Sequence, residues 1–175
     1  MNYFSKKLIF ILPIFFIFHS NLNSDVPYFV DFKYILNESK AGKEAQIYLK
    51  KKLTNGIKQL KDKEKAIQKA EKKIIEQKKL LSAEEYKKKV TDLRNQVASL
   101  QKERNNLMDS VAKQRAKAKS ELLKNLNPII QDYMKEKKIR MVIDKKSILL
   151  ADENLNITKE ITDLLNKKLK SIKLN

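Results

Sequence analysis

The chain has 175 residues, with 39 lysines and arginines against 21 aspartates and glutamates and a formal net charge of +18. It contains no cysteine, one histidine and two glycines, which excludes disulfides, thiol chemistry and a glycine-rich phosphate-binding loop. So basic a chain favours acidic partners, such as nucleic acid, anionic lipid or acidic polypeptide.

The first 24 residues are organised as a secretory signal peptide. Lys6 and Lys7 precede an apolar run, residues 8–18, that is too short to span a bilayer as a helix. We expect cleavage after Ser24, with Ser20 as the alternative site, and export to the periplasm. An uncleaved N-terminal anchor is the competing interpretation.

Cleavage would remove the only histidine, His19, and leave a net charge of +16 that is unevenly distributed. Residues 43–126 contain 24 basic and 11 acidic side chains, a net +13, whereas the rest of the mature chain carries only +3. Positive charge is therefore concentrated in the middle of the chain.

That middle region has the seven-residue spacing of a coiled coil. Its first half has one apolar row, Leu53, Leu60, Ile67, Ile74 and Leu81. The companion row is poor, because Ile57 is followed by Glu64 and Glu71. The second half has two rows, Tyr86, Leu93, Leu100 and Leu107, and Val90, Val97 and Val111, the latter interrupted by Arg104. We predict two long, thin, basic helices.

The two helices are expected to meet in a hairpin near residues 78–90. Ser82 and Glu85 have the spacing of a capping box, which predicts a helix start directly after Leu81. One uninterrupted helix is the alternative. Seven lysines near this tip are predicted to contact a client or a membrane, unless the tip is simply a solvated turn: Lys72, Lys73, Lys78, Lys79, Lys87, Lys88 and Lys89.

The two ends of the mature chain predict a small body. We expect a strand at residues 28–31, a helical turn at 32–38, and a hairpin of two strands at 139–143 and 147–151. Pro128 should kink the returning helix or begin a new one. Thr158 is expected to cap a last helix with an apolar face of Ile161, Leu164, Leu165 and Leu169.

This body, residues 25–42 and 127–175, has 67 residues and would bury little core by itself. Its strands would also have open edges. Both observations favour an oligomer that shares one body. The residues expected to form its core and contacts are Phe29, Val30, Val142, Ile143, Ile148 and Leu149.

Side chains suited to catalysis or metal binding are scarce in the mature chain. Asp31 and Asp144 follow strands, where carboxylates usually cap turns. A calcium-loop spacing is present, but Ile157 replaces the turn glycine and a strand precedes it. The residues with that spacing are Asp152, Asn154, Asn156 and Asp163. We expect no enzyme activity, cofactor or metal.

Three segments, "FVDFKYILNESKAGKEAQ", "LSAEEYKKKV" and "IRMVIDKKSILLADENLNIT", resemble the Skp (OmpH-like) family of periplasmic chaperones over essentially the whole mature chain. Asn156 departs from the aspartate that relatives often have before Ile-Thr. The resemblance implies a homotrimer with a β-sheet body and helical-hairpin arms around a cavity. It also implies binding of unfolded outer-membrane proteins without ATP, and contact with membrane lipid or lipopolysaccharide, for which no residues can be assigned.

The expected fold is mainly α with a small β body (α+β), in which long antiparallel helical-hairpin arms project from a β-sheet oligomerisation body. The expected function is that of an ATP-independent periplasmic holdase, with no nucleic acid as partner. A basic coiled-coil nucleic-acid-binding protein and a structural envelope protein are the alternatives.

Overall fold

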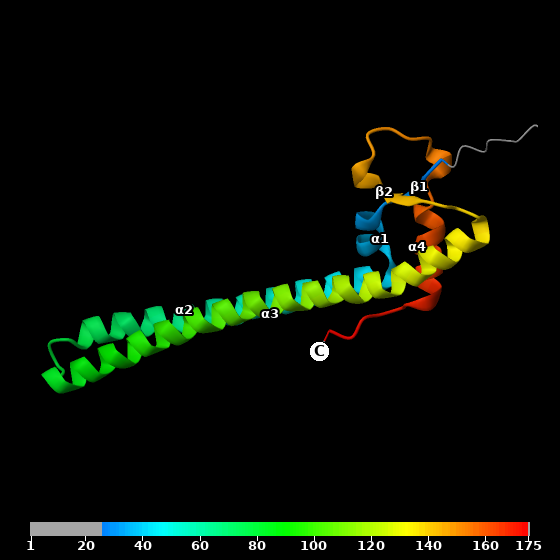
Figure 1. The fold of residues 1–175 in the computed structure, drawn as a ribbon. Coiled ribbons are helices and arrows are strands. Elements are labelled where there is room, and N and C mark those ends of the chain that lie inside the picture. Colours follow the sequence, from blue (N-terminus) through cyan, green and yellow to red (C-terminus); the bar gives the residue numbers. More distant parts are fainter. Residues whose placement is uncertain (1–25, 175) are drawn as a thin grey trace, which may run out of the picture.

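A computed structural model describes residues 26–174, so the predicted signal peptide at residues 1–24 lies outside the described part. A long helical hairpin projects from a small packed end (Figure 1). We call residues 43–126 the arm and the other described residues the body. The elements in chain order are β1 (Tyr28–Val30), α1 (Phe32–Glu38), α2 (Lys40–Gln77), α3 (Ala83–Lys137), β2 (Val142–Asp144), the 3-10 turns η1 (Lys145–Ser147) and η2 (Glu153–Leu155), and α4 (Thr158–Lys168).

A single buried serine separates the body helix α1 from the arm helix α2. Ser39 has an extended backbone, with φ −61° and ψ 152°, so it belongs to neither helix. Its amide donates to the carbonyl of Ile35 at 3.1 Å, and its hydroxyl accepts from the amide of Gly42 at 3.2 Å. Ser39 therefore ends α1 and caps α2, and the chain changes direction without a loop.

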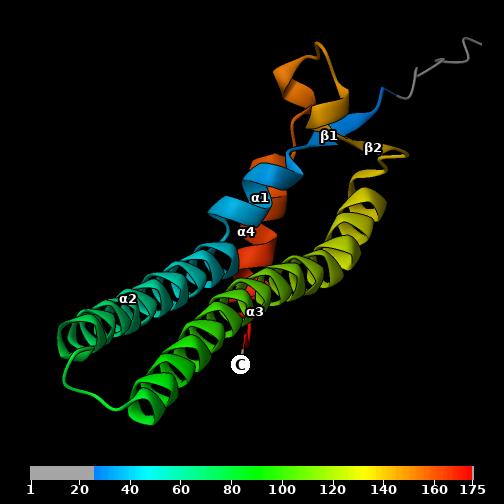
Figure 2. The ribbon, with the colours of Figure 1, turned by 90° about the vertical axis from the view of Figure 1, so that its left-hand side faces the viewer.

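The hairpin predicted at the arm tip is confirmed. The Ser82 hydroxyl accepts from the Glu85 amide at 3.3 Å, and the Glu85 carboxylate accepts from the Ser82 amide at 3.0 Å. Helices α2 and α3 lie side by side in both views (Figures 1 and 2). The alternative of one uninterrupted helix is wrong, because the chain leaves helical geometry between Gln77 and Ala83.

The predicted apolar rows form the contact between α2 and α3, with one exception. The described residues of the two main rows are buried or half-buried along the arm. Val97 was expected in the second row, but its side chain is 50% exposed, so it does not belong to the seam. The partner row of α2 is too polar to offer Val97 an apolar surface at this level.

Helix α3 continues through Pro128 into the body, where Figure 2 shows it bending. Proline has no amide proton, so the helix lacks the hydrogen bond to the carbonyl of Lys124, which permits a bend. The helix ends at Lys138, whose φ of 56° places it in the left-handed region. Of the two alternatives predicted for Pro128, a kink in the returning helix or the start of a new helix, the structure shows the first.

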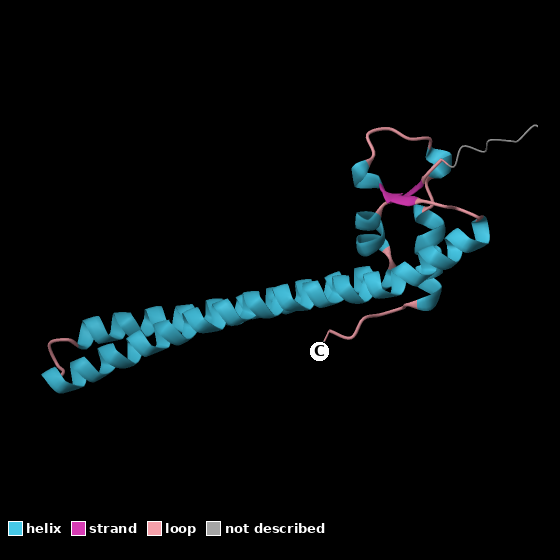
Figure 3. Ribbon diagram, viewed as in Figure 1, coloured by secondary structure: helices cyan, strands magenta, loops and turns pink. Residues whose placement is uncertain are grey.

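The predicted hairpin of strands at 139–143 and 147–151 is wrong. Strand β2 instead pairs in parallel with β1, and Tyr28 lies opposite Val142. After β2 the Asp144 side chain accepts from the Lys146 amide at 3.2 Å and starts the 3-10 turn η1, and no second strand forms at residues 147–151. Figure 3 places both strands in the body, next to the loop between β2 and α4.

The sequence predicts that Thr158 caps α4. In the structure Thr158 is instead the first residue of the helix, and Ile157 occupies the cap position. Its hydroxyl donates to the Asn156 side chain at 2.6 Å and accepts from the Asp31 amide at 2.9 Å. Thr158 therefore joins the start of α4 to the end of β1. On the expected face of α4, Ile161 and Leu165 are fully buried, whereas Leu164 is exposed and Leu169 lies after the helix.

The main hydrophobic core lies between α1, α4 and the body end of α3. Its buried residues are Val30, Ile35, Ala41, Leu122, Leu126, Ile129, Ile130, Ile157, Ile161 and Leu165. Leu122 and Leu126 belong to the last turns of the arm, so the base of the arm is anchored in the body core. No helix in residues 26–174 combines the length and apolar character that crossing a membrane requires.

Candidate functional site

The structure brings the seven predicted lysines to one end of the arm. Lys72, Lys73, Lys78 and Lys79 come from the end of α2 and the turn, and Lys87, Lys88 and Lys89 from the start of α3. All seven are exposed. The Lys78 ammonium lies 5.7 Å from the centroid of the Tyr86 ring, a cation–π distance that links the two sides of the tip. The tip therefore presents a dense positive charge to solvent.

Large apolar side chains accompany this charge. Leu80, in the turn, is 85% exposed, and Ile75, near the end of α2, is 64% exposed. Both lie within a few residues of tip lysines in the sequence. The tip is thus a mixed basic and apolar surface, suited to an acidic and apolar partner.

The Glu85 carboxylate is part of the structure of the tip. Hydrogen bonds from the Ser82 hydroxyl and the Ser82 amide lower the pKa of Glu85 below its ordinary value of 4.5. The carboxylate also lies at the N-terminus of α3, where the helix dipole favours negative charge. Glu85 is therefore ionised at neutral pH and keeps the turn closed.

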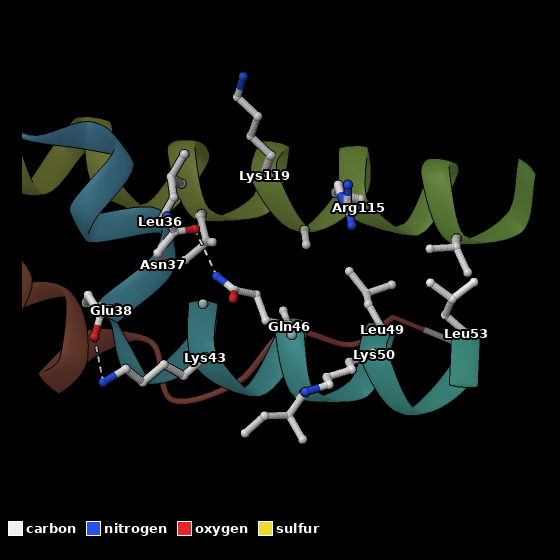
Figure 4. A pocket seen from close by; sticks show the side chains of 16 residues that line it. Leu36, Asn37, Glu38, Lys43, Gln46, Leu49, Lys50, Leu53, Arg115 and Lys119 are labelled. Atoms are coloured by element: carbon white, nitrogen blue, oxygen red, sulfur yellow. Dashed lines mark hydrogen bonds and ion pairs between the residues drawn. The ribbon is translucent and has the colours of Figure 1, made fainter. Parts of the chain in front are cut away.

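A cavity of about 810 Å³ lies at the other end of the arm, between α2, α3 and the end of α1. We call it the arm-base cavity. Figure 4 shows Leu49 and Leu53 pointing from α2 toward α3 along it. Its apolar lining comes from Leu36, Ala45, Ile47, Leu49, Leu53, Val111, Ala118 and Leu122.

The rim of the arm-base cavity is polar and mainly basic. Lys43 is paired with Glu38 at 2.8 Å, and the hydrogen bond to Glu38 raises the pKa of Lys43. The side chain of Gln46 donates to that of Asn37 at 2.9 Å, which ties α2 to α1 (Figure 4). The other basic rim residues, Lys50, Arg115 and Lys119, are exposed. An apolar floor with a basic rim suits an extended apolar chain that carries negative charge.

Three of the carboxylates considered as catalytic or metal-binding groups, Asp31, Asp144 and Asp152, accept backbone hydrogen bonds in turns and caps. Asp31 caps α1 by accepting from the Tyr34 amide at 2.8 Å, as the sequence predicted for strand-end carboxylates. Asp152 accepts from the Asn154 amide at 2.9 Å and so begins η2. In the described part of the chain, no group of three histidine, cysteine or acidic side chains is arranged to bind a metal ion.

The residues predicted for the body core have different environments. Phe29 and Val30 are buried, and Val142, Ile143 and Ile148 are half-buried. Leu149 is 98% exposed, so it is not part of the core of the single chain. It lies in the loop between β2 and α4, which stands away from α1 and α4 (Figure 1). Its role in oligomer contacts remains a prediction.

Sequence reasoning missed the arm-base cavity and the contact of the C-terminal tail with the arm. The cavity depends on how α1 crosses the start of α2, which no local pattern encodes. The tail had a signal, because Ile172 and Leu174 alternate with polar residues as in an extended segment with one buried side.

Comparisons with known proteins identify the family. The profile of the family described as outer membrane protein (OmpH-like) matches residues 28–165. The fold resembles a crystal structure from Caulobacter crescentus CB15 of a proposed OmpH-like outer membrane chaperone. That structure is 19% identical, with a TM-score of 0.78, and the similarity covers 85% of this chain and 89% of the other. No curated protein matches the sequence. Because the profile covers well over half of the chain, this protein belongs to the OmpH-like outer membrane protein family.

Proposed function

We propose that this protein is an ATP-independent holdase chaperone of the periplasm, which binds unfolded outer-membrane proteins and prevents their aggregation before membrane insertion. Membership of the OmpH-like family supports a chaperone role. The predicted signal peptide supports export to a compartment where such clients pass in an unfolded state.

The observation that carries this proposal is the surface of the arm. The arm extends away from the body (Figure 1). Its seam is narrow, and apolar side chains such as Leu80 and Ile75 remain exposed beside many lysines. Exposed apolar groups can bind an unfolded chain weakly at many points. The lysines attract an acidic client from a distance and keep the empty chaperone soluble.

Three copies would combine these surfaces around one client. In the proposed homotrimer, bodies associate through the β1–β2 region and the loop that carries Leu149, and the arms enclose a cavity. Binding by several arms raises the effective concentration of weak apolar contacts, so tight capture needs no deep pocket on any one arm. The basic tips are also proposed to contact anionic lipid or lipopolysaccharide head groups at the membrane.

Shortening the arm tests this function. Residues 67–100 are replaced by a Gly-Asn turn, which keeps the Lys63–Glu103 ion pair and the arm-base cavity. Light scattering follows the aggregation of a diluted, urea-unfolded outer-membrane barrel protein. The shortened protein should suppress aggregation much less than the mature protein, because the distal part of the arm and its basic tip have gone.

Sedimentation and far-UV circular dichroism of the shortened protein serve as controls for assembly and folding. Full protection by the shortened protein would show that the distal arm does not bind the client. A parallel titration with duplex DNA at physiological salt addresses the alternative of a nucleic-acid-binding protein. Tight DNA binding together with no effect on client aggregation would favour that alternative.

A further inference from the structure

The last described residues of the chain pack against the base of the arm. After α4 the chain changes direction, and residues 170–174 run beside the base of the arm (Figure 1). Leu174 is only 3% exposed. Its burial shows that the tail occupies a fitted site.

That site is the first apolar layer of the arm beyond the body core. Leu174 packs in a cluster with Ala45 and Leu49 of α2, and with Val111 and Ala118 of α3. Two of these four residues are alanines, so the facing helices leave space between them that their own side chains do not fill. Leu174 fills this space and completes a layer that elsewhere in the arm is formed by α2 and α3 alone.

A chain of hydrogen bonds fixes the backbone of the tail to both arm helices. The Gln114 side chain on α3 donates to the carbonyl of Leu174 at 2.6 Å. The same side chain accepts from the Lys52 ammonium of α2 at 3.0 Å. Because both ends of the Gln114 amide are used, its orientation is set, and the tail has a specific polar partner.

The tail also contacts the main hydrophobic core of the body. Ile172, two residues before Leu174, packs against both that core and the cluster that contains Leu174. Between them, Lys173 is exposed, as is Ser171 on the other side of Ile172. The extended tail therefore turns its apolar residues inward and spans the junction between body and arm.

We propose that the C-terminal tail, residues 170–174, is a latch that docks between α2 and α3 and restrains the arm relative to the body. The latch is poised to open, because only two apolar side chains and one hydrogen bond offset the conformational entropy that residues 170–174 lose when they become ordered. Ala45, Leu49, Val111 and Ala118 also line the arm-base cavity. Release of the tail therefore exposes the opposite side of the same apolar layer and loosens the wall of the cavity.

Hydrogen–deuterium exchange of the mature, full-length protein tests the latch directly. Leu174→Asp places a charge in the apolar layer, and Ser171→Asp adds the same charge to the same tail at an exposed position. With Leu174→Asp, amides of residues 45–53 and 111–118 should exchange about tenfold faster, while those of α4 keep their rates. Ser171→Asp should leave all of these rates unchanged.

Two further variants test the latch without introducing a charge into the apolar layer. Truncation after Leu169 should reproduce the faster exchange at the arm base, and Gln114→Leu should give a smaller increase. Unchanged exchange at the arm base after truncation would overturn the proposal. So would an equal increase along α4, because the tail would then be an ordinary part of the body core. Neither readout depends on client binding.

Discussion

The guanidinium of Arg104 on α3 lies 3.8 Å from the Glu64 carboxylate on α2. These two residues interrupt the companion apolar rows of their helices, and the hairpin places the two interruptions opposite each other. The adjacent pair, Lys63 and Glu103, has its ammonium and carboxylate 2.6 Å apart with the charges reversed. A slip of one residue would bring like charges together, so this alternation favours the observed register of the arm.

Charge reversal should reveal this register signal. Glu64→Arg places a cation beside Arg104, and Arg104→Glu places an anion beside Glu64, so each single variant should lower the melting temperature slightly. The double variant should recover most of the loss. Because both side chains are about half exposed, we expect a coupling of less than about 1 kcal/mol, measured by a double-mutant cycle at low salt. Strictly additive losses would contradict the pairing.

The two glycines should respond differently to alanine. A Cβ on Gly42 would overlap the carbonyl of Leu36, a backbone group that cannot move without breaking the turn at Ser39. A Cβ on Gly56 would meet only the flexible end of the Leu107 side chain. Gly42→Ala should therefore cost about 1–3 kcal/mol in the free energy of unfolding.

Gly56→Ala is the matched control, since both substitutions gain a similar helix propensity. It should be close to neutral once Leu107 rotates away. Urea denaturation followed by circular dichroism measures both variants. Equal changes in the free energy of unfolding for Gly42→Ala and Gly56→Ala would show that the overlap with the Leu36 carbonyl does not determine the effect at Gly42.

The arm tip should loosen at acidic pH. The folded pKa of Glu85 is lowered by the Ser82 hydrogen bonds, so its stabilising effect is fully present above the unfolded pKa. The effect is lost as pH falls below about 4.5 and through the folded pKa. The protection factors of the amides at residues 82–86, taken relative to the intrinsic exchange rate at each pH, should fall in this range for the wild type. In Ser82→Ala they should already be low at neutral pH, and wild-type protection there would show that the capping box does not hold the turn.

Leu149 should matter for assembly but not for the fold of a single chain. Because the side chain makes almost no contact within the chain, Leu149→Asp should leave the helical content unchanged while lowering the sedimenting mass from that of the proposed trimer toward that of a monomer. Ile161→Ala is the contrasting variant, which removes fully buried methyl groups and should cost about 2–5 kcal/mol. An unchanged trimer with Leu149→Asp would exclude this loop from the interface.

Client capture should depend on the lysines of the tip. Reversal of Lys72, Lys73, Lys87, Lys88 and Lys89 to glutamate should slow association with an acidic unfolded barrel protein. The dependence on salt should weaken at the same time, because exposed charges act over about 8 Å at physiological ionic strength. Stopped-flow fluorescence measures the rates.

The matched control reverses Lys167 and Lys168, which are exposed on α4 and far from the tip in Figure 1. This variant changes the charge of the body but leaves the tip intact, so its association rate should fall less per reversed charge. Equal slowing per charge in both variants would mean that only the net charge matters and that the tip has no special role.

The sequence by itself determined the features that depend on neighbours close in the chain. The seven-residue rows required a helical pair, the Ser82–Glu85 spacing required a helix start, and Asp31 after a strand required a cap. Each of these signals is a hydrogen bond or a periodicity within a few residues, so no distant partner is needed to interpret it.

The tertiary structure decided which distant segments meet. Strand β2 pairs in parallel with β1. This is possible because the arm, which separates the two strands in the sequence, leaves the body along α2 and returns to it along α3. The hydroxyl of Thr158 binds the amide of Asp31, and Leu174 fills a space that two alanines leave between α2 and α3. These contacts depend on surfaces that form only when the helices have packed. From the sequence alone, a short apolar segment could pack equally well against several other segments.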